Sequence, residues 1–99
     1  MDREYVINCL RSQAPAIKAQ GAVSLFLFGS YARDQASETS DVDVFIDYGQ
    51  KNGKPFSIFD LSRIQIIIEN ALKLPVDVLT RDSLKCIKSK AEHDAIQIF

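Results

Sequence analysis

Two apolar segments, joined by a Gly-Ser step and a polar spacer, dominate the sequence between Ser24 and Asp47. The first segment, residues 24–28, is short and almost wholly apolar, which predicts a strand buried on both faces. The second begins with Asp41 and Asp43, which share one face because successive strand side chains point to opposite faces. Two neighbouring carboxylates repel each other, and oxygen-only ligands on a rigid strand suit a hard cation such as Mg²⁺. The pattern therefore predicts two strands and a cation site.

The rest of the chain alternates helical and strand patterns, in the order α-β-α-β-α-β-α. This order predicts an α/β (α+β) fold with a small mixed or parallel sheet of three or more strands flanked by helices. A length of 99 residues predicts one domain, residues 1–99. The expected helices are 3–12, 15–18, 31–34, 58–72 and 84–90, the expected strands are 24–28, 41–48 and 76–79, and residues 91–99 are a final helix or a partner-dependent tail.

The helix expected to end at Leu72 has an unusually wide apolar face. Ser57 and Asp60 have the spacing of a capping box at its start. Leucines and isoleucines continue beyond a single stripe, so the helix either lies deep in the core or has a second partner. Two readings stay open: a broad core face, or a core face plus a surface that meets another subunit.

The charge of the chain limits its partners. The formal net charge is -1, and the sequence lacks the concentrated basic stretch that direct nucleic-acid binding would favour. No apolar run reaches the length of roughly 18–20 residues that spans a bilayer. The N-terminus is charged and is not followed by the apolar segment of a signal peptide. We therefore expect a cytoplasmic protein that contacts neither membranes nor nucleic acids.

A third carboxylate, Asp77, lies in the apolar segment Val76–Leu79. A lone aspartate is unfavourable to bury in a strand without a partner, which favours a functional site over a solvent-facing position. Arg81 and Lys85 follow this strand. Either side chain is long enough to reach a bound phosphate, but a position at the surface is favoured for both.

Residues 29–33, Gly-Ser-Tyr-Ala-Arg, and residues 40–43, Ser-Asp-Val-Asp, resemble the signature of the minimal nucleotidyltransferases of the polymerase-beta-like superfamily. The resemblance extends from the first helix to Leu84 and implies a palm-like core, in which Asp77 matches the third family carboxylate. One departure is visible, since Asp34 stands where the family usually has glycine. The Gly-Ser step and the three carboxylates are unaffected by it.

The resemblance implies nucleotidyl transfer from ATP to an acceptor hydroxyl, with release of pyrophosphate. Two Mg²⁺ ions would stabilise the triphosphate and activate the acceptor. A serine hydroxyl at a helix start, beside a residue without a Cβ, suits phosphate binding. The expected catalytic and metal-binding residues are Asp41, Asp43 and Asp77, and the expected nucleotide-binding residues are Gly29, Ser30 and Arg33.

The acceptor is expected to be a protein, because a chain of this length has little room for a domain that binds a sugar or an RNA end. The resemblance points to a HEPN-domain ribonuclease toxin, in a hetero-oligomer in which this chain is the antitoxin and transfers AMP to a tyrosine of the toxin. Two alternatives remain: neutralisation by masking the partner without essential catalysis, and transfer to a small molecule or RNA.

Overall fold

The computed structural model describes residues 3–33, 41–49, 53–83 and 95–99. Helical residues are also found at 81–83, directly after the third strand. The elements, in chain order, are α1 (Arg3–Ser12), α2 (Ala14–Ala19), β1 (Ala22–Phe28), α3 (Gly29–Ala32), β2 (Val42–Tyr48), α4 (Ile58–Leu72), β3 (Val76–Thr80) and β4 (Ile96–Gln97).

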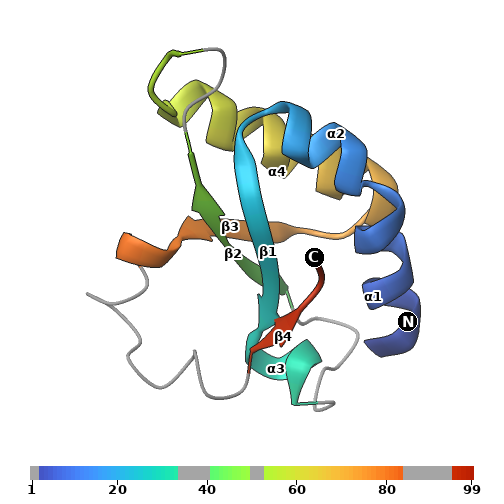
Figure 1. Ribbon diagram of the computed structural model, residues 1–99. Helices are drawn as coiled ribbons and strands as arrows, with labels where there is room; N and C mark the ends of the chain where they lie inside the picture. Colours follow the sequence, from blue (N-terminus) through green and yellow to red (C-terminus); the bar gives the residue numbers. More distant parts are fainter. Residues whose placement is uncertain (1–2, 34–40, 50–52, 84–94) are drawn as a thin grey trace.

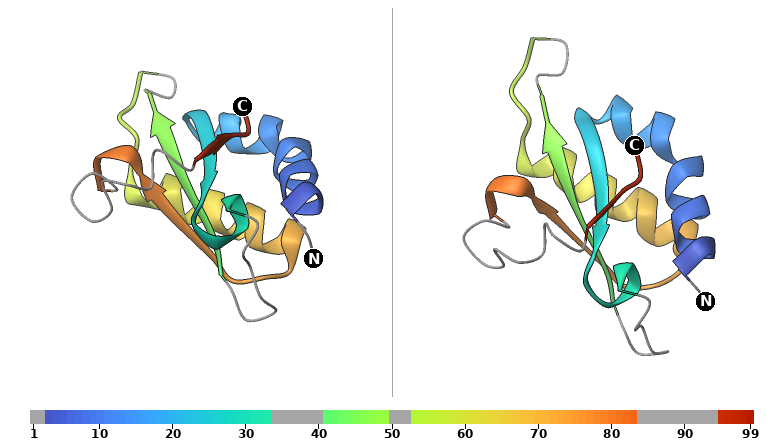
Figure 2. Two further views of the ribbon diagram at one scale, coloured as in Figure 1. Left: turned by 90° about the horizontal axis from the view of Figure 1, so that it is seen from below. Right: turned by 60° about the horizontal axis from the view of Figure 1, so that its bottom comes forward.

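The four strands form one mixed sheet in the order β3-β2-β1-β4 (Figure 1). β1 pairs antiparallel with both β2 and β4, whereas β2 and β3 are parallel. A parallel pair needs a long crossover, which α4 provides here. α3 lies at the end of β1 at which β2 begins, as the views in Figure 2 also show.

The larger core lies between the sheet and the helices α1, α2 and α4, which cover one sheet face (Figures 1 and 2). Alternation along β2 sends every second residue to this face, and all three valine or isoleucine side chains there are buried. The residues that form its centre are Val6, Leu10, Ile17, Leu25, Leu27, Val42, Val44, Ile46, Ile64, Ile68 and Leu72.

The opposite sheet face carries a smaller aromatic cluster. Phe28 and Phe45 are buried in it, and Phe26, Leu79 and Ala95 pack against them. The rings of Phe26 and Phe45 stack with centroids 4.8 Å apart. The prediction that β1 is buried on both faces is therefore confirmed only in part, because Phe26 on this second face stays half-buried.

α4 begins with the predicted capping box, since the Ser57 amide donates a hydrogen bond of 3.0 Å to the Asp60 carboxylate. The wide apolar face of this helix is divided. One stripe enters the core, but Ile58 and Phe59 are each 73% exposed and Ile66 is 56% exposed. The reading of α4 as one broad core face is therefore wrong for Ile58 and Ile66.

The C-terminal prediction also needs correction. Ile96 and Gln97 form a strand, β4, against Leu27 and Phe26 of β1, where a helix or tail was expected. The Leu25 amide also donates to the Phe99 carbonyl at 3.2 Å. The loop expected at 35–40 and the helix expected at 84–90 lie outside the described residues. Within the described ranges, every helix is too short or too polar to cross a membrane.

Candidate active site

Gly29 brings the end of β1 against the side chain of Asp43. Phe28 and Asp43 are register partners in the antiparallel pair, so the chain turns into α3 directly beside this carboxylate. Gly29 has φ +76°, a conformation that residues with a Cβ rarely adopt. A Cβ at this position would also lie 3.2 Å from Asp43 Cγ and 3.3 Å from Asp43 Cβ, and closer still to a carboxylate oxygen. Two independent constraints thus require glycine here.

Ser30 and Arg33 occupy opposite ends of α3. Ser30 is half-buried in the first turn, next to Gly29. The Arg33 amide closes the helix by donating to the Gly29 carbonyl at 3.1 Å, and its side chain is exposed. A contact that the sequence did not reveal fixes this helix from α1, because Arg3 Nη1 donates to the Ala32 carbonyl at 3.3 Å.

The carboxylates predicted from the sequence lie at one end of the sheet. Asp43 and Asp77 are direct register partners in the parallel pair of β2 and β3. Asp41 immediately precedes β2 and belongs to the same face by alternation. The flanking valines explain this placement, because Val42 and Val76 are buried on the helix side and turn the aspartates to the other side.

Asp77 is exposed, whereas the sequence analysis argued against a solvent-facing position for it. Asp43 is half-buried, but Asp77 and Asp41 are exposed. β3 is an edge strand, so Asp77 reaches solvent and avoids the burial penalty that was expected to mark it. The case for Asp77 in the site therefore depends on its register with Asp43 and no longer on burial.

The donor chemistry of this end of the sheet fits a hard divalent cation, but the described side chains do not form a complete cage. Within the described ranges, no group of three or more His, Cys, Asp or Glu side chains is arranged to hold a metal ion. Mg²⁺ is usually bound by one or two carboxylates together with water and substrate phosphates. The pair Asp43 and Asp77, with Asp41 beside it, supplies the oxygen ligands that such binding requires.

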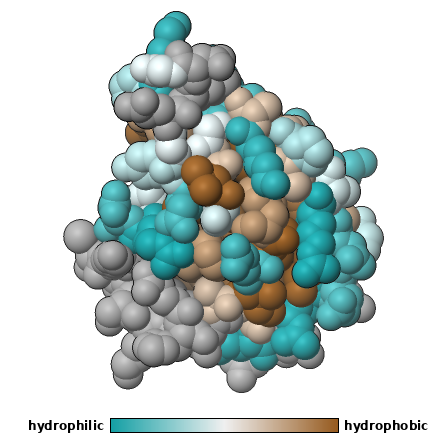
Figure 3. Space-filling view, in the orientation of Figure 1, coloured by the Kyte–Doolittle hydropathy of each residue, from teal (hydrophilic) through white to brown (hydrophobic). Residues whose placement is uncertain are grey.

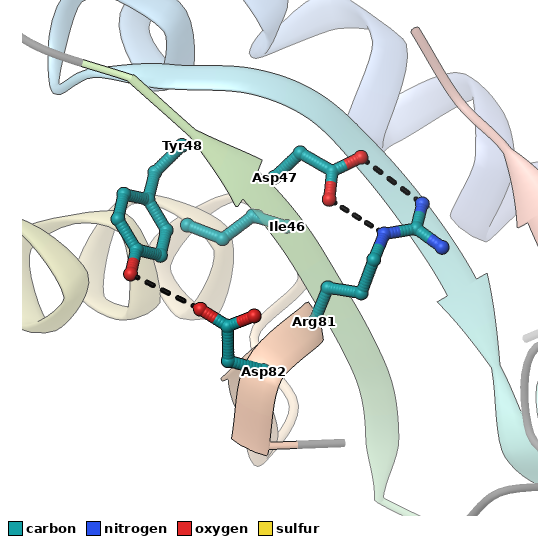
Figure 4. A pocket seen from close by; sticks show the side chains of 5 residues that line it. All are labelled: Ile46, Asp47, Tyr48, Arg81 and Asp82. Atoms are coloured by element: carbon teal, nitrogen blue, oxygen red, sulfur yellow. Dashed lines mark hydrogen bonds and ion pairs between the residues drawn. The ribbon is translucent and has the colours of Figure 1, made fainter. Parts of the chain in front are cut away.

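A polar cluster lies on the same sheet face at the far end of β2. Arg81 Nε donates to Asp47 Oδ1 at 2.6 Å, and Arg81 Nη2 donates to Asp47 Oδ2 at 3.0 Å (Figure 4). Beside this pair, Tyr48 Oη donates to Asp82 Oδ2 at 3.3 Å. Sequence reasoning missed this pair. Its signal was the spacing, since Asp47 follows Asp43 by four residues and Arg81 follows Asp77 by four.

A pocket of about 280 Å³ lies at this far end, lined by Ile46, Asp47, Tyr48, Arg81 and Asp82 (Figure 4). Asp47 is separated from Asp43 by roughly 13 Å of extended strand, at about 3.3 Å per residue. The pocket is therefore distinct from the carboxylate end of the sheet. The candidate active site is the sheet end with its Gly-Ser turn.

The chain matches the nucleotidyltransferase domain family over residues 6–98. A Methanocaldococcus jannaschii protein that carries the provisional name protein adenylyltransferase is 35% identical over 92 residues, or 90% of each chain. The protein adenylyltransferase MntA of Thermococcus cleftensis is 34% identical over 65 residues, covering 66% of this chain and 62% of that protein. A solved structure described provisionally as a minimal nucleotidyltransferase has a TM-score of 0.71 and 29% identity, covering 97% of this chain and 95% of that one.

A chain from the complex of tri-AMPylated Shewanella oneidensis HEPN toxin with its MNT antitoxin has a TM-score of 0.67. Its identity is only 14%, with 98% of this chain and 71% of that chain covered, so this likeness shows the fold alone. The fold and the family match define the class of protein: the chain is a nucleotidyltransferase. Within that class, it belongs to the family of minimal nucleotidyltransferases.

Proposed function

We propose that this chain is an antitoxin that transfers AMP from ATP to a tyrosine hydroxyl of a HEPN ribonuclease toxin. The observation that carries the proposal is the placement of Gly29 against Asp43, with Asp77 in register beside it. This placement puts the Gly-Ser turn directly beside two adjacent carboxylates. Relatives named protein adenylyltransferase support AMP transfer, and the fold neighbour from a toxin–antitoxin complex supports the partner.

Each residue of the site would have a distinct role in the reaction. Gly29 lets the backbone turn directly beside Asp43, and Gly29 and Ser30 would present the start of α3 to the triphosphate, with the serine hydroxyl donating a hydrogen bond. Arg33, exposed at the other end of this short helix, would contact phosphate or the partner. Asp41, Asp43 and Asp77 would hold Mg²⁺, which supplies charge neutralisation of the phosphates and activation of the attacking hydroxyl when bound.

In the proposed reaction the acceptor oxygen forms a bond to the α-phosphorus, and the bond from that phosphorus to the β-bridging oxygen breaks. Pyrophosphate leaves with the electrons of the broken bond. Asp77, which is exposed on the edge strand, would take the hydroxyl proton of an incoming side chain. ATP as substrate and a partner made in the same cell agree with a cytoplasmic location.

A transfer assay tests this proposal. The chain is mixed with the HEPN-domain toxin proposed as its partner, Mg²⁺ and ATP labelled at the α-phosphate. ATP labelled at the γ-phosphate is the control for phosphate transfer. We expect the α-label, and not the γ-label, to appear on the partner. Asp43→Asn is expected to reduce labelling at least about 100-fold. The matched control is Asp82→Asn, an exposed carboxylate at the far end of the sheet, which should label within about twofold of the wild type.

Masking of the partner is the second candidate, and the exposed apolar side chains of α4 favour it. Ile58, Phe59 and Ile66 offer a surface that a partner would cover. The two functions separate in cells that express the toxin. If transfer is essential, Asp43→Asn abolishes protection although the complex still forms. If protection by Asp43→Asn equals that of the wild type and no label is transferred, masking is the function and the proposal of adenylyl transfer fails.

A further inference from the structure

The ion pair of Arg81 and Asp47 continues the register that places the two candidate catalytic aspartates side by side. Asp43 pairs with Asp77, and Ile46 pairs with Thr80, the last register pair of the two parallel strands. The next positions along each strand are Asp47 and Arg81. The charge pair (Figure 4) therefore lies just beyond the last register pair of this ladder. By alternation along the strands it belongs to the face that carries Asp43 and Asp77.

Arg81 also contacts the aromatic cluster that lies between the two ends of the sheet. Its guanidinium carbon is 4.9 Å from the ring centroid of Phe26 and 5.1 Å from that of Phe45. Phe26 belongs to β1 and Phe45 to β2, while Arg81 follows β3. A single side chain thus links three neighbouring strands on this face of the sheet. A planar guanidinium suits this double task, because it can bind a carboxylate with two nitrogens while its face stacks on a ring.

At the opposite end of the ladder, the pairing of β2 with β3 requires stabilisation. Asp43 and Asp77 bring like charges together on adjacent strands, which destabilises their pairing. β3 has only five residues, and among the described residues no strand pairs with its outer edge. A slip of one residue between β2 and β3 would turn Asp77 to the helix side of the sheet. The repulsion at the candidate site and the attraction at the far end therefore act on the same register in opposite directions.

We propose that Arg81 is a positioning residue, which holds Asp77 beside Asp43 through its bonds to Asp47 and its stacking on the aromatic cluster. The inference rests on the proposed function for its link to activity, but its structural part stands alone. It replaces the expectation that Arg81 lies at the surface or reaches the triphosphate. Its guanidinium binds Asp47, which is separated from Asp43 by roughly 13 Å of extended strand.

The test compares four single variants of the full chain in the transfer assay and in amide hydrogen exchange, after circular dichroism has confirmed folding. Arg81→Met removes the charge and keeps an apolar side chain. Arg81→Lys keeps the charge but loses the two-nitrogen contact of the guanidinium, and Asp47→Asn removes the charge of the carboxylate that Arg81 binds. The matched control is Arg63→Met, because Arg63 also pairs with an aspartate, Asp60 at 3.5 Å, but on the outer side of α4.

For Arg81→Met and Asp47→Asn we expect kcat to fall about tenfold or more, because small misplacements of catalytic groups have large effects on rate. The KM for ATP should change less than about threefold, since substrate binding is not the function of this pair. Amides of β3 should exchange about fivefold faster in both variants. The double variant Arg81→Met/Asp47→Asn should have a kcat no lower than that of either single variant. Arg81→Lys should fall between wild type and Arg81→Met, and Arg63→Met should match wild type.

Three outcomes would overturn the inference. If Asp47→Asn keeps the wild-type kcat while Arg81→Met loses it, or if KM for ATP rises with kcat unchanged, Arg81 binds substrate directly. If β3 amides exchange in Arg81→Met as in Arg63→Met, the pair does not hold the strand. Should the wild type transfer no label at all, the proposed function fails, whereas the exchange measurement still decides whether Arg81 fixes β3. If Arg81→Met does not fold, Arg81→Lys and Asp47→Asn carry the same comparison.

Discussion

Replacing Gly29 by alanine tests the central contact of the candidate site. The added Cβ would lie 3.2 Å from Asp43 Cγ and 3.3 Å from Asp43 Cβ, with a carboxylate oxygen nearer than either. The backbone of Gly29 also has φ +76°, which alanine tolerates poorly. The substitution therefore combines two separate penalties, backbone strain and a collision with a candidate catalytic side chain.

The two penalties can be given magnitudes. A left-handed conformation costs a residue with a Cβ about 1–2 kcal/mol. Displacing the half-buried Asp43 side chain adds about 1 kcal/mol, as modest overpacking does. The sum of about 2–3 kcal/mol corresponds to a fall in Tm of roughly 8–24 °C for a domain of this size, at about 4–8 °C per kcal/mol. The forced shift of Asp43 should lower the transfer rate about 100-fold.

Gly53 provides a matched control for this substitution. It has the same φ of +76°, but a Cβ there would meet nothing within 4 Å. Gly53→Ala therefore reports the backbone penalty alone, and the difference between the two variants reports the contact with Asp43. Thermal unfolding followed by circular dichroism measures stability, and the transfer assay is run well below the lower Tm.

A double variant shows whether the collision is with Asp43 itself. In an Asp43→Ala background the carboxylate is gone, so Gly29→Ala should lose about 1 kcal/mol less than it does in the wild type. The reasoning is refuted if Gly29→Ala and Gly53→Ala are destabilised equally and Gly29→Ala retains its transfer rate. Gly29 would then be needed for its backbone conformation only.

Three further substitutions test other parts of the fold by thermal unfolding. Ser57→Ala weakens the capping box of α4 and should destabilise the chain by about 1 kcal/mol, and an unchanged Tm would show that the cap is dispensable. Phe45→Ala removes the centre of the aromatic cluster, 1% exposed, and should cost about 3–5 kcal/mol, while a loss below about 1 kcal/mol would contradict its role as a core residue. Ile66→Ser, at a position 56% exposed, should change the stability of the isolated chain by less than about 0.5 kcal/mol; a Tm that falls and depends on protein concentration would instead indicate contact between copies.

Local sequence signals predicted most of the elements correctly, because periodicity and capping act over a few residues. The helix from Ile58 to Leu72 and its cap at Ser57 are confirmed, as are three of the strands to within two residues at each end. β4 was missed because two residues give no usable period, and its existence depends on hydrogen bonds to β1, which is distant in sequence.

The candidate site depended more strongly on pairing between distant segments. The alternation of Asp41 and Asp43 was visible in the sequence, but the contact of Gly29 with Asp43 follows from the antiparallel register of β1 and β2. The same holds for Asp77, whose exposure follows from the edge position of β3. Burial was the wrong criterion there, because a short strand at a sheet edge can present a charge to solvent without penalty.

The like charges at the end of the parallel ladder lead to a last prediction, that Asp77→Asn stabilises the chain while it reduces transfer. Asp77 is exposed and lies in register with Asp43, and like charges directly opposite destabilise a strand pair by about 0.2–1 kcal/mol. A gain near 0.5 kcal/mol corresponds to a rise in Tm of about 2–4 °C. The gain should shrink at high salt, because exposed charges are screened, and it should vanish in an Asp43→Asn background. A lower Tm for Asp77→Asn, or a gain that persists without the Asp43 charge, would show that the two carboxylates do not repel each other. A rise in Tm with a loss of transfer would mean that the paired carboxylates lower the stability of the chain and are nevertheless required for its activity.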